Sequence, residues 1–320
     1  MLRYLVHRLV QIVPTILLIL VFNFLIIRLA PGDPARAMAG EMASQENVEA
    51  LRQAWGLNKP MHEQLAIYFS RLARGDLGYS YNTLTPVSEL ILDRIPQTVS
   101  LMFAATLLSF VVGTLVGAYA ASRYPSRVDS VLSVSSLVFY SMPIFWFGML
   151  LIYLFAIRLA WLPSGGMIDI MEERHGFAYL LDVGRHAILP VLTLCAFNVP
   201  FFLRISRASL IETLGEDYVR TAKCMGVPRN RLFLRHALPN AMLPTITAFG
   251  LVLGFIFTGA LMTETVFSWP GIGRLMWEAV SNRDYPTMMG IFLISSIAIV
   301  ISSLLTDIAY TLFDPRVRLG

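Results

Sequence analysis

The sequence predicts an all-α membrane protein with six transmembrane helices. Of its 320 residues, 56% are hydrophobic and only 14% are charged, whereas soluble domains carry about 25% charged residues. Six runs contain no Asp, Glu, Lys or Arg: 9–27, 95–122, 130–157, 186–203, 236–263 and 285–306. Each has about the length that crosses a bilayer as a helix, roughly 20 residues. One such run would also suit a buried core helix, but six together indicate a polytopic membrane protein.

Basic residues are unevenly distributed among the segments that connect these runs. The N-terminus, 123–129, 204–235 and 314–320 hold 13 of the 25 Lys and Arg within 54 residues, whereas the alternate segments hold 12 within 116. Cytoplasmic loops are the ones enriched in Lys and Arg, so both termini and the 204–235 segment are predicted to be cytoplasmic. The first apolar run is too long for a signal peptide and no small-residue cleavage site follows it, so it is expected to remain in the membrane.

The chain divides into three parts on this interpretation. Residues 1–30 form the N-terminus and first span, 31–94 an external segment, and 95–320 a core of five spans that includes a cytoplasmic loop, 204–239. In the external segment, Ser44 is a predicted N-cap and Gly56 follows the end of the same helix, while Pro60 opens a second helix. This segment either caps the spans or forms a docking surface for an external partner.

A later external segment, "SWPGIGRLMWEAVSNRDYP", combines a Pro-Gly turn with two tryptophans. Tryptophan is common at the membrane–water boundary. The segment is therefore either an interfacial anchor or a short re-entrant element that lines a pathway.

Most catalytic chemistry is missing from the sequence. The two lysines, Lys59 and Lys223, do not follow a glycine, so no phosphate-binding loop is present, and no H-E-x-x-H zinc motif occurs. We therefore expect no catalytic residue, no metal and no cofactor in this chain. Ser164 in "PSGG" has no base beside it, which argues against an intramembrane hydrolase. Ionisable residues, Glu264 and Asp307, lie only at the ends of apolar runs, which argues against an ion-coupled secondary carrier.

A basic stretch, "YVRTAKCMGVPRNRLFLRHALPNAMLP", stands out in the middle of this apolar chain. A helix is predicted from about Glu212 to Met225, with acids in its first half and bases in its second, as the helix dipole favours. Gly226 is placed to end it in a left-handed conformation, and Pro228 to open the next helix. The unit is either an interfacial helix on anionic headgroups or a rigid knob that docks into a partner's groove.

These residues resemble the EAA motif of bacterial ABC-importer permeases, E-A-A-x-x-x-G followed after nine residues by I-x-L-P. In that register Ala222, Gly226 and Pro239 match. Arg220 departs from the glutamate and His236 replaces the isoleucine, as in the peptide-type variant of the motif. "PGDP", "GDLGYS", "YSMPIFWFGMLL", "LPSGG", "TETVFSWPGIGR" and "FDPRVR" also resemble the B-type permease subunit of dipeptide, oligopeptide, nickel and glutathione importers.

The resemblance implies a type I ABC-importer permease fold in the bacterial cytoplasmic (inner) membrane. Its expected partners are a second homologous permease of the C type, two cytoplasmic P-loop ATPase subunits that bind ATP and Mg²⁺, and an extracytoplasmic substrate-binding protein; membrane lipid surrounds the chain, and nothing points to nucleic acid. Peptides are the expected cargo, with nickel chelates, glutathione and opines as alternatives.

Two sets of site residues follow from this interpretation. The set expected to couple the chain to the ATPases is Glu212, Glu216, Asp217, Tyr218, Arg220, Ala222, Gly226, Arg235, His236 and Pro239. The set expected to line a translocation pathway is Asn23, Gln97, Ser141, Asn198 and Glu264. For each member of the second set the alternative is a hydrogen bond between helices.

Overall fold

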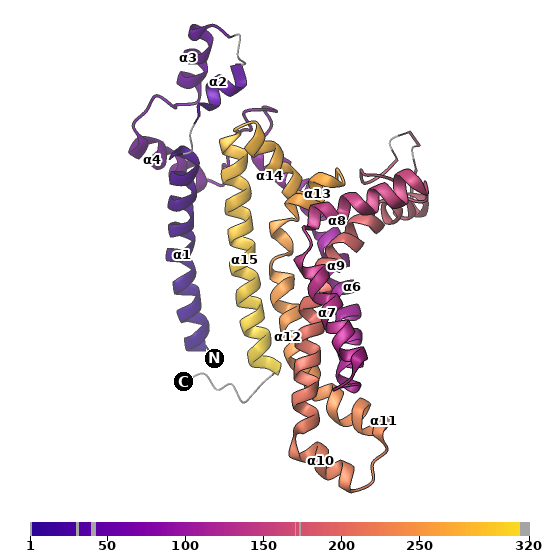
Figure 1. Cartoon of the computed structure of the whole chain (residues 1–320). Helices are drawn as coiled ribbons and strands as arrows, with labels where there is room; N and C mark the ends of the chain where they lie inside the picture. The colour runs from indigo at the N-terminus through magenta and orange to yellow at the C-terminus, as the bar shows by residue number, and fades with distance from the viewer. Residues whose placement is uncertain (1, 30–31, 40–42, 170, 173, 314–320) are drawn as a thin grey trace.

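The structure is a computed structural model that describes residues 2–29, 32–39, 43–169, 171–172 and 174–313. Regular structure in these ranges is helical throughout, apart from an isolated bridge between Tyr79 and Pro86 (Figure 1). The first half contains α1 (Leu2–Leu29), α2 (Pro34–Ala39), α3 (Gln45–Ala54), α4 (Met61–Leu72), α5 (Val87–Leu92), α6 (Ile95–Ser122), α7 (Arg127–Ser141), α8 (Ile144–Leu151) and η1 (Ile152–Arg158). The second half contains α9 (Phe177–Gly215), α10 (Asp217–Cys224), α11 (Arg229–Arg231), η2 (Leu232–Ala237), α12 (Leu238–Gly254), η3 (Ile256–Thr258), α13 (Leu261–Val266), α14 (Ile272–Ser281) and α15 (Tyr285–Phe313).

Four helical stretches in the described ranges are long and apolar enough to cross a membrane: Val87–Ser122, Phe177–Gly215, Arg229–Thr258 and Tyr285–Leu304. The bent pair formed by α7 with α8 and η1 is a fifth candidate, and α1 contains a shorter apolar stretch, Pro14–Leu29. These elements follow the six predicted apolar runs in order. The residues at 314–320, predicted to be cytoplasmic and including most of "FDPRVR", and Pro31 of "PGDP" lie outside the described residues.

The predicted run 130–157 forms a bent pair of helices and not one straight helix. The chain bends by 97° between α7 and α8. Pro143 has no N–H for a helical hydrogen bond, and the preceding Met142 is extended, with φ −74° and ψ 138°, as a residue before proline prefers. Counting charges along the run could not reveal this break.

The helix α9 is much longer than the apolar run 186–203 that predicted it. It spans 39 residues, because charged residues at both ends continue the helix beyond the apolar stretch. Residues 177–185 and 204–215 were expected to lie in connecting segments and are instead helical.

Helices α6 and α9 pack closely along their length. A Cβ atom added at Gly113 would lie 2.8 Å from the carbonyl oxygen of Val199, and one added at Gly117 would lie 2.5 Å from that of Leu203. Small residues four positions apart are a common way for membrane helices to bring their backbones together. These two glycines therefore allow the central contact of the bundle.

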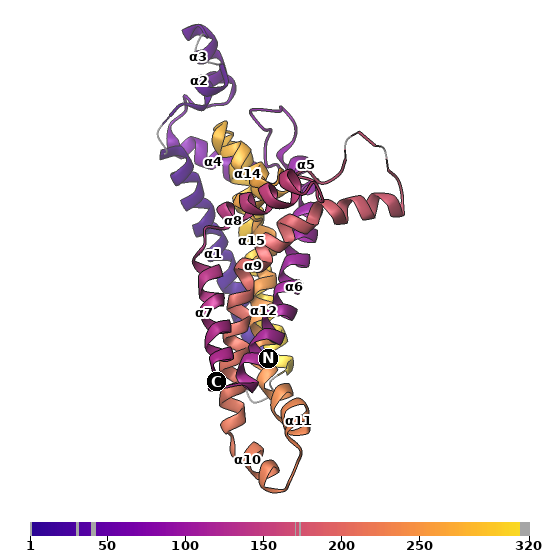
Figure 2. The same ribbon diagram turned by 45° about the vertical axis from the view of Figure 1, so that its right-hand side comes forward.

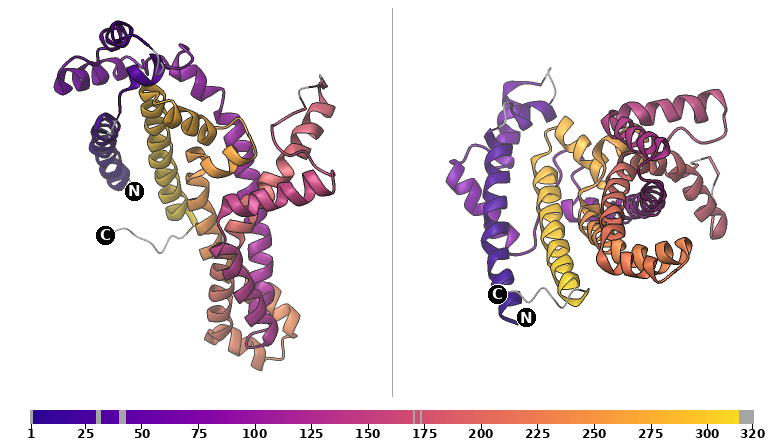
Figure 3. Two further views of the ribbon diagram at one scale, coloured as in Figure 1. Left: turned by 45° about the horizontal axis from the view of Figure 1, so that its top comes forward. Right: turned by 60° about the horizontal axis from the view of Figure 1, so that its bottom comes forward.

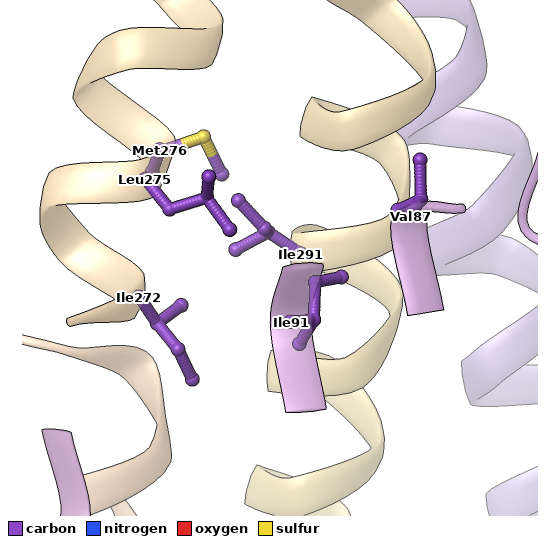
Figure 4. Close-up of a cluster of buried hydrophobic side chains, with 6 residues drawn as sticks. All are labelled: Val87, Ile91, Ile272, Leu275, Met276 and Ile291. Atoms are coloured by element: carbon purple, nitrogen blue, oxygen red, sulfur yellow. The ribbon is translucent and has the colours of Figure 1, made fainter. Parts of the chain in front are cut away.

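The two ends of the bundle have different cores. At the end that carries α2, α3 and α14, the helices α5, α14 and α15 meet in a cluster of Val87, Ile91, Ile272, Leu275, Met276 and Ile291 (Figure 4). At the opposite end, α6, α9, η2 and α12 enclose the cluster of Ala118, Ala121, Leu210, Ala237 and Ala241. The helices α10 and α11 lie at this second end, opposite α2, α3 and α14 (Figures 1 and 2).

Helix α1 lies beside α15, and its first residues point towards the end that carries α10 and α11 (Figure 1). Phe24 and Ile27 of α1 pack with Tyr285 and Met289 of α15. Away from this pair, α8 with η1 and the start of α9 project sideways from the bundle (Figure 3).

The predicted helices of the external segment are present. Ser44 is the N-cap of α3, and its side chain accepts a hydrogen bond from the amide of Asn47. Gly56 follows the end of α3 with φ +67°, and Pro60 immediately precedes α4.

Candidate functional site

The long helix α9 ends where the 204–239 loop turns back towards the bundle. Gly215 is its last residue, and Glu216 is extended, with φ −66° and ψ 148°. The predicted helix from Glu212 to Met225 is therefore interrupted: Glu212 belongs to the exposed surface of α9, and α10 starts at Asp217. The break follows a glycine, which is a weak helix former, and it allows α10 to run in a new direction.

Helix α10 is fixed to the bundle through one face. Val219 is 2% exposed. The Tyr218 hydroxyl accepts a hydrogen bond from the Asn240 amide at 2.8 Å and donates to the backbone oxygen of His236 at 3.4 Å. These contacts join α10 to the start of α12, eighteen to twenty-two residues further along the chain.

The end of α10 is a Schellman motif, as the sequence predicted for Gly226. The Gly226 amide donates to the Lys223 oxygen at 3.1 Å, and the Val227 amide donates to the Ala222 oxygen at 3.2 Å, which is the paired pattern of this cap. Gly226 has φ +80°, and nothing lies within 4 Å of a Cβ built on it. The glycine is thus required by the backbone angle and not by lack of space.

The chain then re-enters the bundle without another break. Pro228 is the residue before α11, one position earlier than predicted, and α11, η2 and α12 form one continuous helical stretch. The segment η2 is a π-helix, which has wider turns than an α-helix. It lies just before Pro239, and this proline has no N–H to donate to the carbonyl four residues earlier. Arg229, in α11, donates a hydrogen bond to the backbone oxygen of Ser122, the last residue of α6, at 2.9 Å.

The tip of the loop is exposed and mixes charge with apolar side chains. Met225 is 78% exposed and Leu234 is 61% exposed. Arg220 and Asp217 have a wide ion-pair contact of 3.7 Å, with side chains 71% and 99% exposed, which contributes little to stability. Of the other predicted coupling residues, the exposed ones are Glu216, Arg235 and Pro239, and the half-buried ones are Ala222 and His236.

The loop thus has a packed base and an open tip. Ala237 is fully buried in the cluster at this end of the bundle, and Phe233 packs against the same cluster. A force applied to the exposed tip would be transmitted to α6, α9 and α12, because Tyr218 of α10 is bonded to Asn240 of α12 and Arg229 of α11 to the end of α6. Phe233 of η2 also packs against the cluster that α6, α9 and α12 share.

The five predicted pathway residues lie in three places. Asn23 is half-buried on α1, and Gln97 and Glu264 are near one another at the end that carries α14. Ser141 ends α7, where its hydroxyl donates to the Leu137 oxygen at 2.9 Å, and Asn198 is half-buried on α9. The residues beside these two, Tyr140 and Phe197, stack at 5.5 Å. The structure of this chain alone therefore does not gather all five around one space.

Glu264 is fully buried, and its carboxylate joins α6 to the α13–α14 segment. Its Oε1 atom accepts from the Thr98 hydroxyl at 3.0 Å and from the Ala260 amide at 3.2 Å, and its Oε2 atom accepts from the Arg274 amide at 3.1 Å. The Thr98 oxygen in turn accepts from the Ile272 amide at 2.7 Å. This network matches the alternative stated for Glu264, a hydrogen bond between helices.

The same segment contains the two tryptophans of the later external stretch. Trp269 is 1% exposed and its indole N–H donates to the Gln97 backbone oxygen at 3.0 Å, so it is not an interfacial anchor. Trp277 is 46% exposed. The Gln97 side-chain oxygen is buried without a hydrogen-bond partner among the described atoms.

An ion pair between α7 and α9 was missed from the sequence. Asp129 is 4% exposed, and its Oδ2 atom accepts from the Arg207 guanidinium at 2.7 Å. Both residues were placed in connecting segments, and 78 residues separate them, so no local pattern could pair them.

The comparisons with known proteins place the chain in a family. Residues 113–319 match the model of the binding-protein-dependent transport system inner membrane component, and residues 1–102 match the model of the N-terminal region of such membrane components. The chain is 39% identical to a di/tripeptide transport system permease protein of Pseudomonas aeruginosa, with 99% of each chain covered. It is 35% identical to an oligopeptide transport system permease protein of Bacillus subtilis, with 99% of this chain and 100% of the relative covered.

A glutathione transport system permease protein of Escherichia coli is also similar, at 37% identity with 99% of each chain covered. Among solved structures, an amino acid ABC transporter has a TM-score of 0.52 over 72% of this chain and 95% of that chain, at 16% identity, a likeness of fold alone. Because the family models match nearly the whole sequence and the relatives align end to end, the chain belongs to the binding-protein-dependent transport system inner membrane components, the permeases of ABC importers.

Proposed function

We propose that this chain is one transmembrane permease subunit of an ATP-driven importer of di- and oligopeptides. It crosses the bacterial cytoplasmic membrane six times, with both termini in the cytoplasm, and forms part of the translocation pathway. Its partners are a second, homologous permease, two cytoplasmic ATPase subunits and an extracytoplasmic substrate-binding protein. ATP and Mg²⁺ bind to the ATPase subunits.

The observation that carries this proposal is the build of the 204–239 loop. The loop exposes the apolar side chains of Met225 and Leu234 beside charged ones, and its base packs against a cluster that α6, α9 and α12 share. A groove on an ATPase subunit would accept Met225 and Leu234 while charged residues of its rim pair with Asp217 and Arg220. Movement of the groove would then tilt α6, α9 and α12 as a unit.

Peptide cargo is supported by the names of the relatives in Pseudomonas aeruginosa and Bacillus subtilis. Glutathione is itself a tripeptide, and the Escherichia coli relative carries its name, so glutathione is the first alternative cargo. Nickel chelates and opines are the others. The residues proposed to line the pathway are Asn23, Gln97, Ser141 and Asn198; Glu264 positions the α13–α14 segment at its external end.

The direct test is to tag the chain in its native host, purify it in mild detergent and identify the accompanying chains. We expect two nucleotide-binding ATPases, or two copies of one, and a second permease, with vanadate-sensitive ATP hydrolysis. A chain that purifies alone and moves substrate under an ion gradient in liposomes would overturn the proposal in favour of a secondary carrier.

Cargo is tested separately in cells that lack the gene. Uptake of radiolabelled tri-alanine should be restored by the wild-type gene and should be competed by unlabelled peptides. If the gene restores uptake of labelled glutathione and not of tri-alanine, the importer assignment stands and the cargo changes.

A further inference from the structure

A cavity of about 440 Å³ lies between α1, α15 and the 31–94 segment. Its wall is formed by the last turn of α1, the connection from α3 to α4, α4 itself, the turn at 76–84 and the start of α15. Arg28 ends the apolar stretch Pro14–Leu29, so the cavity lies where the chain leaves the membrane on the external side.

The cavity carries an excess of positive charge. Arg28, Lys59 and Arg71 line it, and Asp76 is the carboxylate among its lining residues. The Oδ1 atom of Asp76 already accepts from the Gly78 amide at 2.8 Å. An anion that enters the cavity would therefore meet three cations and one carboxylate, and that carboxylate already accepts a hydrogen bond within its own turn.

Arg28 is held in a fixed position with one donor unused. Its guanidinium lies over the rings of Phe24 and Tyr285, at 5.7 Å and 5.4 Å from their centroids. Its Nε atom is buried and has no hydrogen-bond partner among the described atoms. A buried donor of this kind calls for an acceptor, and the nearby anionic groups of the chain are engaged elsewhere. Asp284, for example, accepts from the Tyr81 amide at 3.0 Å and the Thr287 hydroxyl at 2.8 Å.

A second lining residue offers an unused acceptor. The Gln64 Nε2 atom donates to the backbone oxygens of Leu57 and Lys59, at 3.2 and 2.8 Å. These two bonds fix the amide orientation, because a flipped amide would face both carbonyls with its own oxygen. The Gln64 Oε1 atom is buried and unpartnered among the described atoms, so the cavity presents a donor for an anion and an acceptor for an N–H or O–H group.

The remaining wall is aromatic and apolar. Trp55 stacks on Tyr81 with their centroids 3.8 Å apart and their planes within 5°, and Tyr68 stacks on Phe24 at 5.9 Å. Burial raises the pKa of Tyr81, and the Arg28 guanidinium opposes that shift by its charge and by a side-chain hydrogen bond, so the guanidinium lies beside this aromatic wall.

We propose that this cavity is a binding site for an anionic molecule whose oxyanion pairs with Arg28 and which carries a hydrogen-bond donor for Gln64. Two sources have this chemistry. One is an anionic phospholipid headgroup of the outer leaflet, such as phosphatidylglycerol with its phosphate and hydroxyls. The other is a free peptide, with its terminal carboxylate and amide N–H groups. The site is separate from the 204–239 loop and does not depend on the proposed transport function.

The chain provides its own reporter for occupancy, because Lys59 and Lys223 are its only lysines. Lys59 lines the cavity and Lys223 lies in α10 at the other end. We would place the chain with its co-purifying partners in phosphatidylcholine nanodiscs, acetylate the lysines briefly and measure both sites by mass spectrometry. One arm adds phosphatidylglycerol to the bilayer and another adds tri-alanine.

At a ligand concentration about ten times the dissociation constant, the free fraction of the site is about one-eleventh, so acetylation of Lys59 should fall about tenfold relative to Lys223. Arg28→Gln should weaken binding at least about tenfold, as expected for loss of a charge-assisted hydrogen bond, so at the same ligand concentration the protection of Lys59 should fall to about twofold or less. Arg28→Lys should retain part of it. The matched control is Arg74→Gln, an exposed arginine of the same segment outside the cavity.

The two arms identify the source of the anion. Protection by phosphatidylglycerol alone assigns a lipid site, and protection by tri-alanine alone assigns a soluble peptide. Unchanged acetylation in both arms overturns the proposal. So does protection that Arg28→Gln preserves, provided that the variant still co-purifies with its partners.

Discussion

Replacement of Gly226 tests whether the 204–239 loop works as a rigid unit. The residue has φ +80°, and a Cβ there would meet nothing within 4 Å. A substitution is therefore opposed by backbone strain alone, about 1–2 kcal/mol for an L-residue in the left-handed region. Such a change lowers the population of the Schellman cap by a factor of roughly 5–30.

The series Gly226→Asn, Gly226→Ala and Gly226→Val separates strain from contact with a partner. Asparagine tolerates the left-handed region and a β-branched residue is the least suited to it, so the defect should increase from Asn through Ala to Val. Hydrogen exchange of residues 218–232 should accelerate in the same order, and peptide uptake should fall in parallel, while membrane insertion stays normal.

The result that would refute this reasoning is equally definite. If Asn is as harmful to uptake as Val while hydrogen exchange remains near wild type, the glycine is needed as open space for a docking subunit and not for its backbone angle. Normal uptake by Gly226→Val would count against the loop as the coupling element altogether.

Three further predictions concern the packing of the bundle and are measured as thermal unfolding in detergent. Glu264→Ala should destabilise the chain more than Glu264→Gln, because alanine leaves buried donors unpaired at about 1–3 kcal/mol each; equal effects would show that the network contributes little. Gly117→Leu should prevent folding because its side chain would clash with the backbone of α9. Gly250→Ala should be tolerated because there is open space around Gly250. A stable Gly117→Leu protein would contradict the close approach of α6 to α9. Asp129→Ala should cost about 1.5–3 kcal/mol by leaving the half-buried Arg207 without its carboxylate, and the double change Asp129→Leu with Arg207→Met should recover most of that. A double variant as unstable as the single one would argue against the ion pair as the cause.

Local signals in the sequence were enough for several parts of the molecule. Runs without charge located the helices of the bundle, because a bilayer imposes a minimum apolar length on each span. The caps at Ser44 and Gly226 were also predictable, since each depends on the chemistry of one residue and its near neighbours. The coupling residues of the 204–239 loop were singled out for testing by the resemblance of this loop to the EAA motif.

Other features required the tertiary structure, because they join residues that no local pattern relates. The 97° bend after α7 depends on whether neighbouring helices support a straight or a broken path through Pro143. In the sequence, Glu264 is a polar residue at the end of a predicted span. It becomes part of a buried hydrogen-bond network only because α6 brings Thr98 next to it. The cavity beside Arg28 is assembled from segments more than 250 residues apart along the chain.

The sequence by itself therefore determined the class of the protein, the apolar part of each long helix and the caps at Ser44 and Gly226, because these follow from hydropathy and backbone preference within about twenty residues. The tertiary structure decided which buried polar side chains have hydrogen-bond partners and which do not. That distinction depends on what lies within about 3 Å of each polar atom, and only the packed helices set those distances.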